Sequence, residues 1–345
     1  MAEPREPNRR VKYLARQSDR MYKYFTGTIS GTIVVLMTAV VAVLFYAGYP
    51  SLVVNGIGFF TGSVWRPTPP NARIITINGI ETLSGSSYGV LVFAADTLVS
   101  SAIALTLAVP ASLGIAIFLT QIAPRRIAAS ISFTLELLAG IPSVIYGFWG
   151  FLILSPFLLQ VLEPFLAQHL SFIPFFAPLS TESPIQSPGL LAAGILLAIM
   201  VVPIISSISR DFMARTPIEL KDGAKALGLT RWEVTRSVVL PYAKTGIIGS
   251  IILGLGRALG ETMAVAMVSG TAVQTLPTSL YFSVNTVASF MALKLGEVAR
   301  DPTGMYQAAL MELAIVLLLI TVTVNVIARL VIKQVFATSE TVVRV

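Results

Sequence analysis

Six long apolar runs divide the chain, and each is long enough to cross a lipid bilayer as an α-helix. A helix of about 20 residues spans the hydrocarbon core, which is roughly 30 Å thick. The approximate limits of the runs are Phe25 to Ala47, Val90 to Leu119, Ile131 to Leu154, Gly189 to Ile208, Gly246 to Ser269 and Ala309 to Ile332. The pattern predicts an all-α, polytopic membrane protein. We expect one six-helix domain over residues 25–332, between a basic N-terminal segment, 1–24, and a tail, 333–345.

Lysine and arginine alternate between rich and poor connections, and this alternation indicates the orientation of the chain. Seven precede the first run and seven lie in the connection 209–245, whereas 48–89 and 270–308 hold two each and 155–188 holds none. The connection after the second run has two more, and the C-terminal end has three. Cationic residues are retained on the cytoplasmic side during membrane insertion. Both termini and the connection 209–245 are therefore predicted to be cytoplasmic, and the loops 48–89, 155–188 and 270–308 extracytoplasmic.

Composition narrows the class further. Hydrophobic residues make up 55% of the 345 residues and charged residues only 12%, with a mean hydropathy of +0.80, which excludes an ordinary soluble domain. The net charge of +7 could suggest a nucleic-acid partner, but the basic residues are distributed by membrane side and are not gathered on one face. Because the chain has no cysteine, it has neither a disulfide nor a thiolate metal site.

Prolines and small residues set the expected form of the loops. The loop 48–89 is rich in Gly, Pro, Ser and Asn and is predicted to be irregular surface chain. The loop 155–188 contains six prolines, which predicts short amphipathic or re-entrant pieces, because proline interrupts a regular helix. Pro142 and Pro203 fall inside apolar runs and are expected to kink them.

Residues for catalysis or for metal binding are scarce in this sequence. It contains no Walker A motif, so we expect no ATP site, no cofactor and no enzymatic activity on this chain. Gly254, Gly256 and Gly260 lack the dinucleotide-binding spacing and are predicted to form a close helix-packing surface. The single histidine, His169, has neither a second ligand nor a carboxylate partner nearby in sequence, which makes it a weak metal or proton-relay candidate.

The predicted cytoplasmic connection contains a charged, helix-forming stretch from Asp222 to Pro241. Its first part reaches Gly228, a residue suited to the left-handed position that ends a helix. Thr230 can then cap a second helix, with Glu233 three residues later as in a capping box. The stretch therefore predicts a helix, a turn and a second helix. A membrane protein that holds such a loop at its surface usually docks a partner there.

This stretch resembles the EAA loop of ABC-importer permeases. The residues at the matching intervals are Asp222, Gly223, Ala224, Gly228, Val238, Leu240 and Pro241. The motif usually begins Glu-Ala-Ala, so the first two residues here depart from it. The resemblance implies that the loop is the coupling helix that docks in a groove of a separate ATPase subunit. The alternative is a solvated amphipathic loop without a partner.

Two charged residues, Arg257 and Glu261, lie inside the fifth apolar run. A charge near the bilayer centre costs about 2.5 to 3.5 kcal/mol on an insertion scale, so two of them require a reason. Four residues apart on a helix, they share one face and can neutralise each other. They form either an internal ion pair that fixes packing or part of an anion path. In such a path the guanidinium would bind phosphate oxygens, and the carboxylate would accept a hydrogen bond from a protonated phosphate but repel sulfate.

A second resemblance favours the anion path. The segments RALGETMAV, from Arg257 to Val265, and AGIPSVIYGFWG, from Ala139 to Gly150, resemble the membrane subunit of bacterial phosphate importers of the PstC type. The likeness extends from about Val90 to the end of the sixth run. It implies a type I ABC-importer permease fold in a prokaryotic plasma membrane, with Arg257, Glu261 and Thr262 on the phosphate path.

The same resemblance implies the partners. They are a PstA-type permease, a PstB-type ATPase dimer that carries ATP and Mg²⁺, and a PstS-type extracytoplasmic phosphate-binding protein. Two other functions stay open: an ABC permease for molybdate or sulfate, and, more distantly, a proton-coupled carrier that uses Arg257, Glu261, Glu136 and Asp96 as a relay. Glu136 is otherwise expected to pair with Arg125 or Arg126, and Asp96 to lie at the outer interface.

Overall fold

The computed structural model describes residues 9–177, 189–269 and 276–340, with side chains described from residue 21 to residue 330 of these ranges. Parts of the predicted segments 1–24, 155–188, 270–308 and 333–345 therefore lie outside the described residues. Six helices in the described part are long and apolar enough to cross a membrane, as predicted. They comprise Met21–Asn55, Leu91–Ile122, Ser143–Leu170, Leu190–Ala214, Arg231–Gly260 and Met305–Leu330.

The described elements are mainly helices, with a few short strands. The helices are α1 Arg9–Asn55, α2 Ile57–Thr61, α3 Leu91–Ile117, α4 Arg125–Gly140, α5 Ser143–Trp149, α6 Ser155–Phe157, α7 Glu163–Leu170, α8 Leu190–Ala214, α9 Ile218–Ala226, α10 Arg231–Val234, α11 Leu240–Gly260, α12 Met263–Val268, α13 Val287–Lys294 and α14 Met305–Glu340. Wider π-helical turns lie at Phe118–Ile122, Gly150–Leu154, Leu158–Leu162 and Thr235–Val239, and 3₁₀ turns at Pro174–Phe176 and Leu295–Arg300. The strands are β1 Trp65–Arg66, β2 Ile74–Ile77, β3 Ile80–Leu83 and β4 Ser87–Tyr88.

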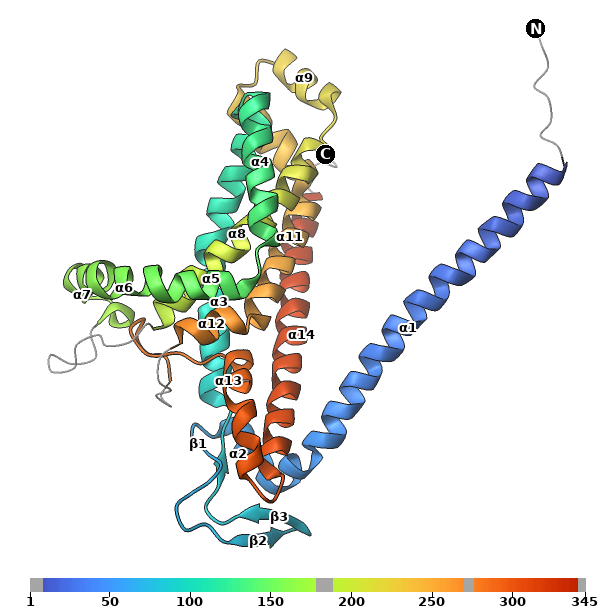
Figure 1. Cartoon of the computed structure of the whole chain (residues 1–345). Helices are drawn as coiled ribbons and strands as arrows, with labels where there is room; N and C mark the ends of the chain where they lie inside the picture. The colour runs from blue at the N-terminus through green and yellow to red at the C-terminus, as the bar shows by residue number, and fades with distance from the viewer. Residues whose placement is uncertain (1–8, 178–188, 270–275, 341–345) are drawn as a thin grey trace.

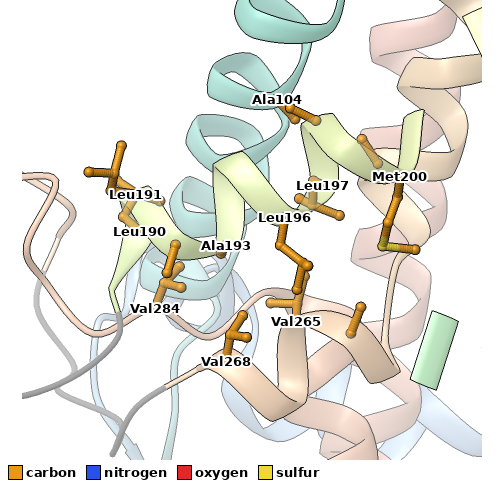
Figure 2. Packing of buried hydrophobic residues seen from close by; sticks show 14 of the residues in the cluster. Ala104, Leu190, Leu191, Ala193, Leu196, Leu197, Met200, Val265, Val268 and Val284 are labelled. Atoms are coloured by element: carbon orange, nitrogen blue, oxygen red, sulfur yellow. The ribbon is translucent and has the colours of Figure 1, made fainter. Parts of the chain in front are cut away.

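Helix α8 lies at the centre of the bundle, between α3 and α11 (Figure 1). Its residues Leu190 to Ile205 contribute ten of the 21 buried residues of the main hydrophobic core. Figure 2 shows Leu196 of α8 lying beside Val265 and Val268 of α12. Gly254 lets α11 approach α8, since a Cβ there would lie 2.7 Å from Val201 Cγ1. Gly256 and Gly260 do not pack against another helix in the described part of this chain, because a Cβ at either position would meet no atom within 4 Å.

Helix α1 packs against α14 near the hairpins and then diverges from the bundle (Figure 1). The contact is close at Gly48, where a Cβ would lie 3.1 Å from the backbone nitrogen of Glu312. Figure 1 shows that the Arg9 end of α1, the Glu340 end of α14 and α9 all lie on the side of the molecule opposite the hairpins. The two predicted cytoplasmic ends thus lie on the side of the predicted cytoplasmic loop.

The third apolar run is not one straight helix, contrary to the prediction. Helix α4 ends at Gly140, Ile141 and Pro142 are extended, and a new helical segment begins at Ser143 and continues to Leu170. Proline favours extended backbone at the residue before it, so Pro142 causes a complete break instead of the expected kink. Helix α4 runs along the bundle, whereas α5 to α7 lie across it (Figure 1). At Pro203 the helix α8 continues without a break.

Two prolines lie inside the helical run that crosses the bundle, where short re-entrant pieces were predicted. Pro156 and Pro164 each follow a π-helical turn. The backbone N–H groups of Ser155 and Glu163 donate to carbonyls five residues earlier, those of Gly150 and Leu158. The wider turns relieve the clash that a proline ring makes with the carbonyl four residues before it, so the helix continues.

The loop 48–89, predicted to be extracytoplasmic, is also more regular than expected. Strands β2 and β3 form an antiparallel hairpin whose two-residue turn is Asn78 and Gly79, both with positive φ (52° and 80°). Asn-Gly is the preferred pair for a tight hairpin turn, and the sequence carried this signal. Strands β1 and β4 form a second antiparallel pair. Trp65 of β1 packs edge-on against Phe290 of α13 at 5.2 Å between ring centroids, which ties the hairpins to the helices.

Candidate functional site

Arg257 and Glu261 do not share a helix face, contrary to the prediction. Helix α11 ends at Gly260, and Glu261 is extended, with φ −68° and ψ 125°. Oε1 of Glu261 accepts a hydrogen bond from the backbone N–H of Ala264 at 3.3 Å, near the start of α12. The spacing argument requires an unbroken helix, and Glu261 instead stabilises the start of a new one. No ion pair in the described part of the chain contains either residue.

The break between α11 and α12 lies near α5, the first part of the helical segment that lies across the bundle. Helix α12 packs against α5, where a Cβ at Gly147 would lie 2.8 Å from the Cα of Ala264. The hydroxyl of Tyr146 donates to the carbonyl oxygen of Leu138 at 2.9 Å across the break at Pro142. The two motifs that resemble the phosphate importers are thus brought together by the fold. Thr262 lies in the break itself, and its hydroxyl donates to the carbonyl oxygen of Gly260 at 3.2 Å.

Arg257 lines a cavity of about 740 Å³ between α8, α11 and α14. Two glycines of α11, Gly249 and Gly256, widen the cavity, since a Cβ at either would meet no atom within 4 Å. The lining residues are Ile204, Gly249, Ile252, Leu253, Gly256, Arg257, Asn325 and Arg329. Glu261 does not line it, because its buried carboxylate is turned to the start of α12.

The cavity is electropositive. Arg257 and Arg329 are its two charged residues, and neither takes part in an ion pair within the described ranges. Nε of Arg257 and Oδ1 of Asn325 are buried without a hydrogen-bond partner. A buried polar atom normally has a partner, so these two atoms mark a place for a polar ligand. Guanidinium groups fit the oxygens of phosphate and carboxylate.

The sequence prediction missed Asn325 and Arg329. The charge pattern assigns Arg329 to the cationic C-terminal end, and no motif singles out Asn325. A signal was available, because the two residues are four apart on a helix and share one face. Polar residues on one face of a membrane-spanning helix commonly face a cavity or a partner helix.

The loop 209–245, which is predicted to be cytoplasmic, has the expected helix–turn–helix form. After α9, Gly228 has φ +88°, and its N–H donates to the carbonyl oxygen of Lys225 at 2.9 Å. The N–H of Leu229 donates to Ala224 at 3.3 Å, and the two bonds form a Schellman motif. Thr230 and Glu233 form the predicted capping box at the start of α10.

The exposed surface of this loop contains large apolar side chains that the sequence prediction did not name, among them Ile218, Leu220, Leu227 and Trp232. Leu227 is 83% exposed and Trp232 is 60% exposed. Among the predicted coupling residues, Gly223 has open space around it, Ala224 is buried, and Asp222 forms an exposed ion pair with Lys225 at 3.0 Å. The other predicted coupling residues, Leu240 and Pro241, form the first turn of α11. Large exposed apolar groups on a polar loop are typical of a docking site.

Glu136 pairs with a different residue from those predicted. Its Oε1 lies 3.2 Å from Nη2 of Arg210 in α8, which also contacts Asp211 at 2.8 Å. The predicted partners, Arg125 and Arg126, form no ion pair in the described part of the chain. The packing of α4 against α8 brings Arg210 to Glu136, and the ion pair then links the two helices.

Asp96 and His169 lie away from the cavity. Asp96 is buried in α3, not at an exposed interface, and its Oδ2 accepts from the backbone N–H of Asn285 at 2.9 Å. His169 is exposed in α7, with Nδ1 2.9 Å from the carbonyl oxygen of Phe165. The described residues contain no group of three His, Cys, Asp or Glu side chains placed to hold a metal ion.

Comparison with known proteins places the chain among transporters. Residues 82–336 match the profile of a family described as binding-protein-dependent transport system inner membrane component. The chain is 40% identical over 315 residues to the phosphate transport system permease protein PstC of Xylella fastidiosa, covering 91% of this chain and 90% of that protein. It is 39% identical over 285 residues to PstC 1 of Mycobacterium tuberculosis, covering 83% of this chain and 84% of the relative.

Among solved structures, the chain is similar to one of a bacterial ABC transporter involved in the import of the acidic polysaccharide alginate. The identity is 17%, the TM-score is 0.47, and the similarity covers 69% of this chain and 78% of that one. A likeness of this size is too weak to indicate what this chain transports.

Proposed function

Because this chain belongs to the family of binding-protein-dependent transport system inner membrane components, we propose that it is the permease subunit of an ATP-driven importer of inorganic phosphate. It adopts a type I importer permease architecture and resides in a prokaryotic plasma membrane with both termini in the cytoplasm. A second, PstA-type permease completes the path, a PstB-type ATPase dimer binds ATP and Mg²⁺, and a PstS-type extracytoplasmic protein delivers phosphate. The relatives named as phosphate transport system permeases support this substrate.

The observation that carries the proposal is the unpaired guanidinium of Arg257 in a cavity of the membrane domain. An unpaired cation there is costly unless an anion visits it. Arg257 therefore binds phosphate in transit, with its planar fork of donors against the phosphate oxygens. Glu261 and Thr262 hold the break between α11 and α12, which fixes the end of the helix that carries Arg257.

A long helical segment supports the proposed coupling between the ATPase and this cavity. From Arg231 to Gly260 the chain forms one continuous helical segment, which begins in the cytoplasmic loop and ends three residues after Arg257. At 1.5 Å per residue, the distance from Arg231 to Arg257 is about 40 Å. The ATPase docks on Leu227 and Trp232, and closure of its two subunits tilts this rod, so that the cavity opens alternately to the two sides.

The proposal is tested with the complete complex in sealed vesicles that enclose the ATPase and ATP. Labelled phosphate is supplied outside the vesicles. We expect uptake that requires ATP hydrolysis and persists when ionophores collapse every ion gradient. Uptake that needs a proton gradient and no ATPase would identify a secondary carrier instead. Uptake of molybdate or sulfate in preference to phosphate would identify a permease for another oxyanion.

A further inference from the structure

We propose that Asn325 and Arg329 of α14, together with Arg257, form a phosphate-binding site in the cytoplasmic half of the membrane domain, and that Asn325 selects protonated phosphate. The inference rests on the proposed function and names the residues that act after phosphate has passed the break in α11. All three residues line the same cavity. Asn325 and Arg329 are one helical turn apart and therefore share a face of α14.

The two arginines lie at different depths. Helix α11 runs from the cytoplasmic loop toward the centre of the membrane domain and carries Arg257 near its deep end. Helix α14 runs in the opposite direction, toward Glu340, so Arg329 lies about 6 Å nearer its cytoplasmic end than Asn325. A phosphate leaving Arg257 meets the amide of Asn325 and then the guanidinium of Arg329. Two guanidinium groups with a polar amide between them lower the free-energy barrier for an anion that crosses apolar surroundings.

The two buried atoms without a hydrogen-bond partner match the chemistry of a protonated phosphate. Nε of Arg257 is a buried donor without an acceptor, and Oδ1 of Asn325 is a buried acceptor without a donor. Dihydrogen phosphate has both charged oxygens and hydroxyl groups, so it can satisfy the two atoms at once. Sulfate has no proton to donate at neutral pH and would leave Oδ1 unpaired. A site built to bond a substrate hydroxyl strongly rejects the analogue that lacks it.

This assignment moves selection from Glu261 to Asn325. Glu261 is 8% exposed, and its Oε1 is engaged by the N–H of Ala264. Asn325 carries no charge that would repel the anion, and it lines the cavity. Gly249 and Gly256 leave the space that an anion of this size requires, because no atom lies within 4 Å of a Cβ placed at either.

The test uses the full complex in phosphatidylcholine vesicles with labelled inorganic phosphate and unlabelled sulfate as competitor. We expect Asn325→Leu and Arg329→Gln each to lower the initial uptake rate about tenfold, the effect of losing one hydrogen bond to a charged ligand. In Asn325→Leu, sulfate should also become a better competitor. Arg329→Lys keeps the charge without the planar fork, so its rate should be intermediate. Arg126→Gln removes a cytoplasmic-side arginine outside the cavity and should retain the wild-type rate.

Copurification of the ATPase with each variant shows that the complex has assembled, and Arg329→Lys replaces Arg329→Gln if the latter does not assemble. Wild-type rates in assembled Asn325→Leu and in both Arg329 variants would overturn the assignment while leaving the proposed function intact. If the wild-type complex itself moves no phosphate, the proposed function fails first.

The headgroup of an anionic lipid carries the same phosphate chemistry, and a second arm separates the two sources. The uptake assays are repeated in vesicles that contain phosphatidylglycerol, and copurified lipid is measured in each variant. We expect the Asn325 and Arg329 defects to be the same in both vesicle types. Variants that lose copurified anionic lipid but transport phosphate at the wild-type rate would identify a lipid site and overturn the inference.

Discussion

Leu227 gives the sharpest test of where the ATPase docks. Its side chain is 83% exposed at the turn between α9 and α10, in a loop otherwise rich in charged residues. Leu227→Ala removes three carbon atoms, each worth about 0.8 kcal/mol when buried. If the ATPase groove covers the exposed part of the side chain, the variant loses about 2 kcal/mol of binding free energy. That loss weakens the affinity for the ATPase about thirtyfold.

The assay titrates purified ATPase onto the permease pair held in lipid nanodiscs, and the dissociation constant is measured for each variant. Leu295→Ala is the matched control, because Leu295 is 62% exposed in a 3₁₀ turn at the hairpin side of the molecule. We expect that control to bind as the wild type does. Equal affinities for Leu227→Ala and the wild type would refute the docking surface, whatever the effect on transport.

Three further predictions concern packing and the loop. Gly147→Val should lower the melting temperature of the detergent-solubilised complex, because overpacking against Ala264 costs about 1 to 3 kcal/mol; an unchanged temperature would contradict the close approach of α5 and α12. Gly228→Ala should destabilise the loop by about 1 to 2 kcal/mol, since φ is +88° there, and faster proteolysis of the loop would report it. Hydrogen bonds from the backbone N–H and the hydroxyl of Thr230 lower the pKa of Glu233, so the cap is intact above the ordinary carboxyl range and is lost as the pH falls through the lowered value. The fluorescence of the neighbouring tryptophan should therefore change only in acid, and Glu233→Gln should abolish that transition.

Hydropathy and local capping chemistry were sufficient to predict much of this fold. The number of membrane-length helices is the predicted six, because length and apolarity are local properties, although the third apolar run is divided between α4 and the helical segment that begins at Ser143. The capping box and the left-handed glycine between α9 and α10 are likewise set by residues within a few positions of each other. The breaks after Gly140 and Gly260 were missed, because hydropathy does not mark where a helix stops inside an apolar run.

The candidate site was predicted only in part. Arg257 could be found because a charge inside an apolar run is costly, and the structure places it in a cavity. The predicted pairing with Glu261 is wrong because it requires a helix that continues through Glu261, whereas α11 ends at Gly260. Asn325 and Arg329 were missed because their role depends on the packing of α14 against α11, two helices that are distant in the sequence.

The most direct test of the account is ATP-dependent phosphate uptake by the reconstituted complex that carries Arg257→Gln. Arg257 loses its charge without a large change in volume, and the ATPase should remain bound because the cytoplasmic loop is untouched. We predict an assembled complex that hydrolyses ATP but takes up at least about tenfold less phosphate, as expected for the loss of a charge-assisted hydrogen bond. Uptake at the wild-type rate would contradict the assignment of this cavity to the phosphate path.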